Sequence, residues 1–425
     1  MSFQKVLLQG LGLLLSVNFS LQAQQSTTIT LQNCYQKVET NYPLVKQYNL
    51  LQIAQQYNID NLAKGYLPQI QLAAQASYQS DVTRIPNVFP NVQIDPLSKD
   101  QYKVYAEVIQ PISDLFAVGA KQDLVKYNVE IEKTKIDVAL HQVKEKVNQL
   151  YFGVLLIEHQ IQQVEILKKD IQAAQKQLTV AVQNGVALKT TADVLQAELL
   201  KAQQRSIELK SARLSYLQIL GALMSETLDE NTNLQTPEMP ILTKANNRPE
   251  RSLFDAQIML QEEETRLLKY NLYPKLYFFA QGGYGRPHLN LLDNNFDFYY
   301  IAGLRFSWNI SNFYTNKTDR KIKEVTTSII KNQKEVFELT INQGLIQINN
   351  DIAKLEALIE TDKEIIAIRE TAKNTAETQL SNGAITVNDF IKFLDAVDMA
   401  RQNLAIHQTQ LLMSQYNYLL TTGNN

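Results

Sequence analysis

The fold is decided by residues 143–178, which read VKEKVNQLYFGVLLIEHQIQQVEILKKDIQAAQKQL within a proline-free stretch from Ser113 to Gln183. Apolar residues recur there at helical spacing, and Gln, Lys and Glu occupy the other faces. The stretch predicts one helix of about 70 residues, roughly 100 Å long at 1.5 Å per residue. A helix this long must bury its apolar stripe against partners of similar length. Asn184-Gly185 should end it, because glycine readily adopts the left-handed conformation of helix ends.

Composition excludes several classes of function. The chain has 425 residues, with 41 Lys and Arg against 43 Asp and Glu, so it carries no basic surplus for nucleic acid. Its single cysteine, Cys34, excludes an intramolecular disulfide and a thiolate metal cluster. The four histidines lie far apart in the sequence. We therefore expect no metal site and no cofactor.

The first residues are typical of a signal peptide. Lys5 precedes the apolar run 6–17, and Leu21-Gln22-Ala23 offers a small-residue cleavage site, so residues 1–23 should be removed. A signal anchor is the weaker alternative, because the apolar run is short. No later run of 18 apolar residues follows, so any membrane crossing by the exported chain must use strands.

Four segments alternate with the period of two that is typical of strands, at about 69–79, 102–110, 275–285 and 298–309. Each is long enough to cross a bilayer at a tilt. A half-buried strand of a soluble sheet alternates in the same way, but four of matched length favour a water-filled barrel. We predict that Lys103, Glu107 and Arg305 line its lumen, and that Tyr102, Tyr284, Phe298 and Trp308 lie at the membrane interface.

The chain repeats itself. Pro43 and Pro68 recur at Pro249 and Pro274 with one shared offset, and Asn184-Gly185 recurs at Asn382-Gly383. The repeat is too long for a solenoid and indicates a duplicated domain. We predict a first repeat at 24–224 (long helix 113–183, return helix 191–224), a linker at 225–248 and a second repeat at 249–425 (long helix 316–381, return helix 389–421).

The predicted fold class is mainly α with a membrane β part. Four strands cannot enclose a water-filled lumen, because a barrel needs at least eight strands, and about twelve or more for a usable pore. Two chains would give eight strands and a lumen filled by side chains, and three chains would give twelve. Several chains must therefore assemble one barrel. The duplicated helical hairpins would then form a second, α-helical barrel that continues the first away from the membrane.

Short motifs follow one another in a fixed order. Asn41-Tyr42-Pro43-Leu44 and Arg248-Pro249-Glu250 open the repeats, and Leu67-Pro68 and Tyr273-Pro274 lead into the strands. The tips read Asn184-Gly185 before Asp193-Val194-Leu195-Gln196-Ala197, and Asn382-Gly383 before Asp389.

This order resembles that of the TolC-type outer-membrane efflux protein family, over essentially all of the mature chain. The resemblance implies a homotrimer with a 12-stranded barrel in the outer membrane, in contact with outer-membrane lipid, and a long periplasmic extension. It also implies a periplasmic adaptor (membrane fusion) protein and an inner-membrane RND or ABC-type transporter as partners. Small molecules, either drugs or metal ions, would leave passively through the channel, which is no enzyme.

Two other functions remain open. The same family includes channels for type I protein secretion. A periplasmic coiled-coil protein, either structural or an adaptor, would also be exported and helical, although the strands and the duplication argue against it.

Functional residues are expected at the tips, where charged side chains of symmetry-related chains can form rings. By resemblance, Asp389 matches the family's gate position and Lys392 stands where some members have a second acid, while Phe390-Ile391-Lys392-Phe393 departs from the family pattern. The alternative is that Asp193 and Asp389 only stabilise the starts of the return helices. The predicted gate and tip residues are Asn184, Gly185, Asp193, Asn382, Gly383, Asp389 and Lys392.

Overall fold

The computed structural model describes residues 28–83, 96–183, 188–243, 245–290 and 292–424. The predicted signal peptide at 1–23 and the tip residues Asn184 and Gly185 therefore lie outside the described residues. The fold is mainly helical with few strands, as the sequence predicts. Its helices are α1 (Leu31–Asn41), α2 (Lys46–Ala63), α3 (Leu115–Gln183), α4 (Lys189–Met224), α5 (Pro249–Tyr270), α6 (Asn312–Ser381) and α7 (Val387–Thr422), with short 3-10 turns at Pro43–Val45 and Lys64–Tyr66.

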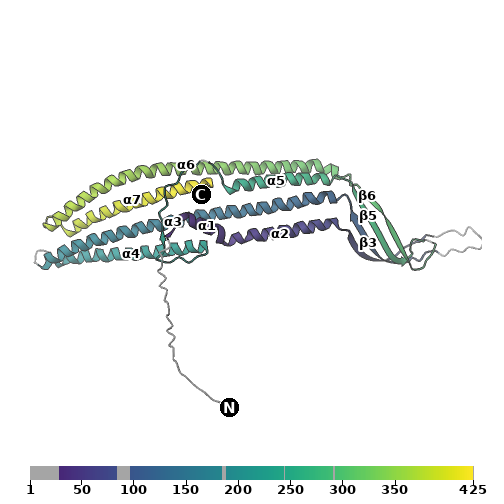
Figure 1. The fold of residues 1–425 in the computed structure, drawn as a ribbon, viewed down its shortest axis with the longest axis horizontal. Helices are drawn as coiled ribbons and strands as arrows, with labels where there is room; N and C mark the ends of the chain where they lie inside the picture. The colour runs from purple at the N-terminus through teal and green to yellow at the C-terminus, as the bar shows by residue number, and fades with distance from the viewer. Residues whose placement is uncertain (1–27, 84–95, 184–187, 244, 291, 425) are drawn as a thin grey trace, which may run out of the picture.

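The molecule is elongated, with its helices along the long axis and a sheet at one end (Figure 1). Helix α3 has 69 residues and α6 has 70, so each is roughly 100 Å long. Helices α2 and α5 pack beside the halves of α3 and α6 that lie nearer the sheet, and α4 and α7 pack beside the other halves. Each long helix thus packs against two shorter helices that lie end to end.

The long helices begin a few residues away from their predicted starts. Helix α3 starts at Leu115 rather than Ser113, because the Ser113 hydroxyl oxygen accepts a hydrogen bond from the backbone N–H of Leu276 at 3.0 Å. Helix α6 starts at Asn312 rather than about 316, and the Asn312 side chain donates to the carbonyl of Asn271 at 2.8 Å. Both long helices thus begin at contacts with the segment that leads from α5 into β5.

The sheet has strands β2 (Gln69–Tyr78), β3 (Asp100–Pro111), β5 (Lys275–Arg286) and β6 (Asp297–Ser307), all antiparallel in the order β2-β3-β5-β6. Pairing of β3 with β5 joins the hairpins of the two repeats. One face carries apolar side chains that are open to solvent, such as Leu72 at 77% exposed and Tyr300 at 82%. Strands β2 and β6 form the two edges and have no further strand partner in the described part of the chain.

Within the described ranges, no helix combines the length and the apolarity that a bilayer crossing requires. The helices instead bury their apolar stripes against one another.

The largest apolar core lies at the middle of the long axis, where α1 and the ends of α4 and α7 surround the centre of α3. Tyr151, Leu217 and Met224 are completely buried there. Strand β1 (Thr28–Ile29) pairs in parallel with β4 (Asn233–Leu234) of the linker and closes this core.

A buried polar cluster fixes the second repeat to this core. The Arg248 guanidinium contacts the carboxylates of Glu145 at 2.9 Å and Glu250 at 2.5 Å, and it donates to the carbonyl of Leu420. His141 contacts the same carbonyl at 2.8 Å through its ring nitrogen, and burial lowers its pKa. The Arg248-Pro249-Glu250 motif therefore joins the middle of α3, the start of α5 and the end of α7.

Candidate functional site

The helical tip, at the end of the molecule remote from the sheet, joins the two helical hairpins through an apolar cluster. We call this set of buried residues the tip cluster. Phe390 and Leu394 of the second hairpin pack in it against residues of the first, and Phe390 is only 2% exposed. Its members are Ile171, Ala174, Leu178, Leu195, Leu199, Ala376, Val387, Phe390 and Leu394.

The turn of the second hairpin is a glycine-ended helix terminus. Gly383 has φ of +70°, a conformation that side chains with a Cβ rarely adopt. Its N–H donates to the carbonyl of Leu380 at 3.0 Å, and the N–H of Ala384 donates to the carbonyl of Gln379 at 2.8 Å. These two bonds form a Schellman motif around the cap residue Asn382. The corresponding pair Asn184-Gly185 lies outside the described residues.

Asp389 lies in the first turn of α7 and takes part in its cap. The Thr386 hydroxyl donates to the Asp389 carboxylate at 2.7 Å and accepts from the Asp389 N–H at 3.2 Å. Lys392 donates to the same carboxylate at 3.0 Å. Thr386 and Lys392 together hold the pKa of Asp389 below its ordinary value. The geometry is therefore that of a helix cap, and a role of Asp389 in a pore stays a prediction.

Asp193 differs from its counterpart. It is exposed, and the described structure gives it no hydrogen bond or ion pair. The N-cap of α4 is Leu188, whose side chain cannot accept a hydrogen bond. The structure therefore separates two acids that the sequence treats alike, and leaves Asp193 available to solvent.

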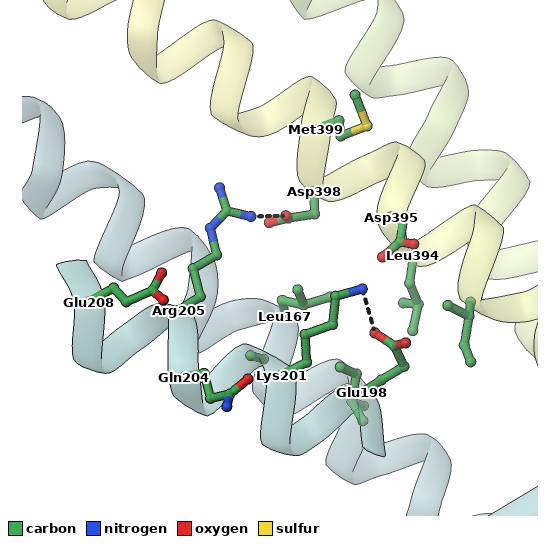
Figure 2. Close-up of a pocket in the computed structure, with 13 residues that line it drawn as sticks. Leu167, Glu198, Lys201, Gln204, Arg205, Glu208, Leu394, Asp395, Asp398 and Met399 are labelled. Carbon is green, nitrogen blue, oxygen red and sulfur yellow. Dashed lines mark hydrogen bonds and ion pairs between the residues drawn. The ribbon is translucent and has the colours of Figure 1, made fainter. Parts of the chain in front are cut away.

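A groove lies between the two hairpins next to the tip cluster, with a volume of about 470 Å³ (Figure 2). We call it the inter-hairpin groove. Arg205 of α4 reaches across it towards Asp398 of α7, with 3.8 Å between the charged atoms, and donates to Gln402 at 2.5 Å. A second bridge joins Lys373 of α6 to Asp170 of α3 at 3.0 Å. The lining residues that carry charge are Glu198, Lys201, Arg205, Glu208, Asp395 and Asp398.

No pattern in the sequence predicts this groove. Asp398 is almost completely buried, and burial raises its pKa, while Arg205 opposes that rise. Arg205 and Asp398 belong to different repeats, so no local spacing connects them. Only the packing of α4 near α7 brings the two side chains together.

Lys103, Glu107 and Arg305, which we predict to line a lumen, all lie on one face of the sheet. The Arg305 guanidinium contacts the Glu107 carboxylate at 3.3 Å and lies over the ring of Phe279, 4.8 Å from its centre. Lys103 belongs to the same face of β3, four residues before Glu107. The strand register thus separates these charges from the apolar face, as water on one side and lipid on the other would require.

The four aromatic residues assigned to the interface divide into two groups. Tyr284 contacts the ring of Phe298 at 4.8 Å, and both Tyr284 and Tyr102 stack near Phe296. Trp308 lies at the other end of β6, where its indole N–H donates to the carbonyl of Leu272 at 3.1 Å. The strand between Phe298 and Trp308 spans roughly 33 Å, or about 25 Å at a tilt of about 40°. That height matches the apolar band of outer-membrane barrels.

Comparisons with known proteins agree with this geometry. Residues 34–226 match the family model described as outer membrane efflux protein. No curated protein matches the chain in a direct comparison.

Solved structures match over nearly the whole chain. The outer membrane protein VceC of Vibrio cholerae is 12% identical, with a TM-score of 0.65 over 93% of this chain and 97% of its own. The CmeC outer membrane channel of Campylobacter jejuni is 12% identical, with a TM-score of 0.63 over 93% and 85%. The MtrE outer membrane channel of Neisseria gonorrhoeae is 13% identical, with a TM-score of 0.64 over 93% and 89%. At these identities the likeness establishes the fold.

Proposed function

Since the chain belongs to the TolC-type outer-membrane efflux protein family, we propose that it is the outer-membrane exit duct of a tripartite efflux pump. It passes small molecules, drugs or metal ions, from the periplasm to the outside. It performs no chemistry, and the energy comes from an inner-membrane pump.

The exposed apolar face of the sheet is the observation that carries this proposal. Ile70 and Leu72 on β2 and Phe298 and Tyr300 on β6 are each at least 75% exposed, and Val104 on β3 and Phe278 on β5 continue the same face at 53% and 44%. Soluble proteins rarely expose so large an apolar patch. Lipid covers it in our proposal, and Glu107 and Arg305 on the opposite face border a water-filled lumen.

Three copies of the chain complete the channel. In the described part of the chain, β2 and β6 form the two edges of the sheet, and the four helices beside it follow the order α2, α3, α5, α6 (Figure 1). The outer helices carry exposed apolar side chains, including Leu50 and Tyr57 on α2 and Ile322 and Val325 on α6. Pairing of β2 with β6 and of α2 with α6 in a ring of three gives 12 strands, enough for an aqueous lumen.

The helical tip contacts the partners. We assign it to a periplasmic adaptor protein, which connects the duct to an RND or ABC-type transporter. Gly383 and its surrounding turn, the end of the molecule remote from the sheet, are the surface that such a partner meets first.

Electrophysiology on purified protein tests the proposal. Outer membranes of cells that express the full chain should contain a heat-modifiable, trypsin-resistant trimer, and this trimer should conduct ions in planar lipid bilayers. Recovery as a soluble monomer without conductance would contradict the channel function.

A further inference from the structure

One face of the sheet carries aromatic rings beside its charges. The odd-numbered residues of the strands lie on this face, opposite the exposed apolar side chains, and our proposed function turns it towards the lumen. Tyr105 of β3 and Tyr299 of β6 stand on either side of Gly283 of β5 in one row of cross-strand partners. Lys103 lies next to Tyr105 on this face, two residues earlier in β3. We call Lys103, Tyr105 and Tyr299 the lumen patch.

The glycine between the two tyrosines lets their side chains approach each other across β5. A Cβ on Gly283 would be 2.9 Å from Cζ of Tyr299 and 2.7 Å from Cβ of Tyr105, so no larger residue fits there without a shift. Both tyrosines are half-buried. The Tyr299 ring therefore rests on the backbone of β5 beside Tyr105. A ring that rests on a sheet turns one face away from the sheet, and here that face meets the lumen.

Two cations of this face lie near aromatic rings, and only one of them has a counter-charge. The Arg305 guanidinium lies over the Phe279 ring and contacts the Glu107 carboxylate at 3.3 Å. The Lys103 ammonium is exposed and lies over the Tyr105 ring, with Nζ 5.8 Å from the ring centre. In the described part of the chain, no carboxylate forms an ion pair with Lys103. Arg305 is thus satisfied, whereas Lys103 is open to an anion.

The chemistry of the lumen patch selects an occupant with two features. An exposed ammonium favours an anion, and a carboxylate accepts charge-assisted hydrogen bonds from it. Ring faces beside that ammonium favour an aromatic group, because aromatic pairs gain energy beyond the area they bury. Asp297 stands across β5 from Lys103, but its carboxylate accepts from the neighbouring Phe298 N–H at 2.7 Å and forms no ion pair with any described residue. The ammonium therefore keeps its charge for a solute.

We propose that the lumen patch binds small aromatic carboxylates, with the carboxylate at Nζ of Lys103 and the aromatic ring against Tyr105 and Tyr299. This inference rests on the proposed duct function, for which it names one class of solute. All three residues belong to one chain, so each copy carries a complete patch. Binding therefore does not require the ring of three.

Saturation-transfer NMR on the purified protein in a non-ionic detergent measures binding without transport. The probe is benzoate, and two related molecules each change one of its features. Cyclohexanecarboxylate keeps the charge without the aromatic ring, and benzylammonium keeps the ring with the opposite charge. We expect saturable binding of benzoate, and binding about fivefold weaker or less for each of the other two. Equal binding of benzylammonium would overturn the proposal, because it would show that the patch does not select anions.

Two lysines of the same face give matched variants. Lys275 of β5 is also exposed, but its ammonium lies 3.6 Å from the Asp114 carboxylate. Lys103→Gln should weaken benzoate binding about tenfold, the effect of one hydrogen bond to a charged group. Lys275→Gln should leave it unchanged. Equal binding by the two variants would mean that benzoate enters the detergent micelle or follows the general charge of the sheet, and the site would be refuted.

The aromatic contact has its own test. The double variant Tyr105→Leu, Tyr299→Leu should still bind benzoate more tightly than benzylammonium, but it should lose the preference for benzoate over cyclohexanecarboxylate. A preference that persists in full would contradict a ring contact at these two residues. Heat-modifiability of the trimer shows whether this variant folds, and the variants of the exposed lysines test the site independently of it.

Failure of this inference can be told apart from failure of the duct function. Ion conductance in planar bilayers without saturable benzoate binding would overturn the lumen patch and leave the duct function intact. Saturable benzoate binding that Lys103→Gln weakens, in a protein that conducts no ions, would support the patch and contradict the duct.

Discussion

At the scale of single residues, two acids of α7 have opposite environments. Asp389 is about half exposed and is paired with Thr386 and Lys392, which lower its pKa. Asp398 is buried beside the inter-hairpin groove, and burial raises its pKa. The ionised form of Asp389 thus stabilises the fold, whereas the ionised form of Asp398 is disfavoured by it.

Conductance measurements can show whether Asp389 is only a helix cap or also lies in the pore. If its charge lies in the path of ions, Asp389→Ala should raise conductance or relax cation preference in planar bilayers. Thr386→Ala is the control, because it removes the cap hydrogen bond at 3.2 Å but leaves the carboxylate. Identical effects of the two variants would reduce Asp389 to a helix cap.

The buried Asp398 carboxyl should make the stability of the fold depend on pH. Its folded pKa lies above the unfolded value of about 3.9, so its contribution to stability is lost as pH rises from about 4 through the raised pKa. Asp398→Asn cannot ionise and should have a higher melting temperature than the parent at pH 7, with a difference that vanishes towards pH 4.

The control for this variant should change the melting temperature at pH 7 in the opposite direction. Asp389→Asn should melt below the parent at pH 7, because the lowered pKa of Asp389 gives stability that is present above pH 4 and lost as pH falls. Circular dichroism melts from about pH 2 to about pH 8 measure both, because the stability from Asp389 is lost only below about pH 4. A lower melting temperature of Asp398→Asn at pH 7 would mean that its 3.8 Å contact with Arg205 outweighs the cost of burial.

At the scale of elements, the turn between α6 and α7 depends on a single glycine. A Cβ on Gly383 would meet nothing within 4 Å, so the cost of a substitution there comes only from the positive φ. The tip cluster then holds the two hairpins together beyond the turn. A substitution at Gly383 therefore tests the backbone conformation of the turn without disturbing the packing of the tip cluster.

Gly383→Ala should destabilise the turn by about 1–2 kcal/mol, the cost of the left-handed conformation for a residue with a Cβ. Amide hydrogen exchange at the end of α6 and the start of α7 should accelerate accordingly. Gly383→Asn is the matched control, since asparagine tolerates this conformation better. Unchanged exchange in Gly383→Ala would show that the turn can adopt another conformation at no cost.

At the scale of the whole molecule, our proposal makes the chain one part of a ring of three. Among the described residues, the strands at the two ends of the strand order (β2 and β6) and the helices at the two ends of the helix order (α2 and α6) each have a neighbour on one side only. Unlike edges that meet in a head-to-tail fashion generate a closed ring when the rotation fits. The proposed trimer therefore predicts which helices become neighbours between chains.

Cross-linking checks the trimer. Tyr57 of α2 and Ile322 of α6 are exposed by 67% and 55%, at similar distances from the sheet along their helices. The double variant Tyr57→Cys, Ile322→Cys, treated with a flexible bis-maleimide, should form covalent dimers and trimers. Burial raises the pKa of the Cys34 thiol to about 12, so the native cysteine should not react.

The single-cysteine variants are the controls for this experiment. In a head-to-tail ring α2 does not face α2, so Tyr57→Cys alone should give only monomer after denaturation. Dimers from Tyr57→Cys alone would indicate a two-fold interface and would contradict the ring.

The sequence alone determined the elements and their order. The proline-free stretch from Ser113 to Gln183 predicts α3, and period-two alternation predicts the four strands, because each pattern reflects which face of a local element is buried. The left-handed glycine at Gly383 also follows from its place after a helix.

Only the tertiary structure decided which distant side chains meet. The inter-hairpin groove, with Arg205 and Asp398, combines residues from both repeats. Periodicity fixes the face of a helix but not the register at which two long helices pack. That register depends on contacts such as those of Arg248 with Glu145 and Leu420, which no local pattern in the sequence encodes.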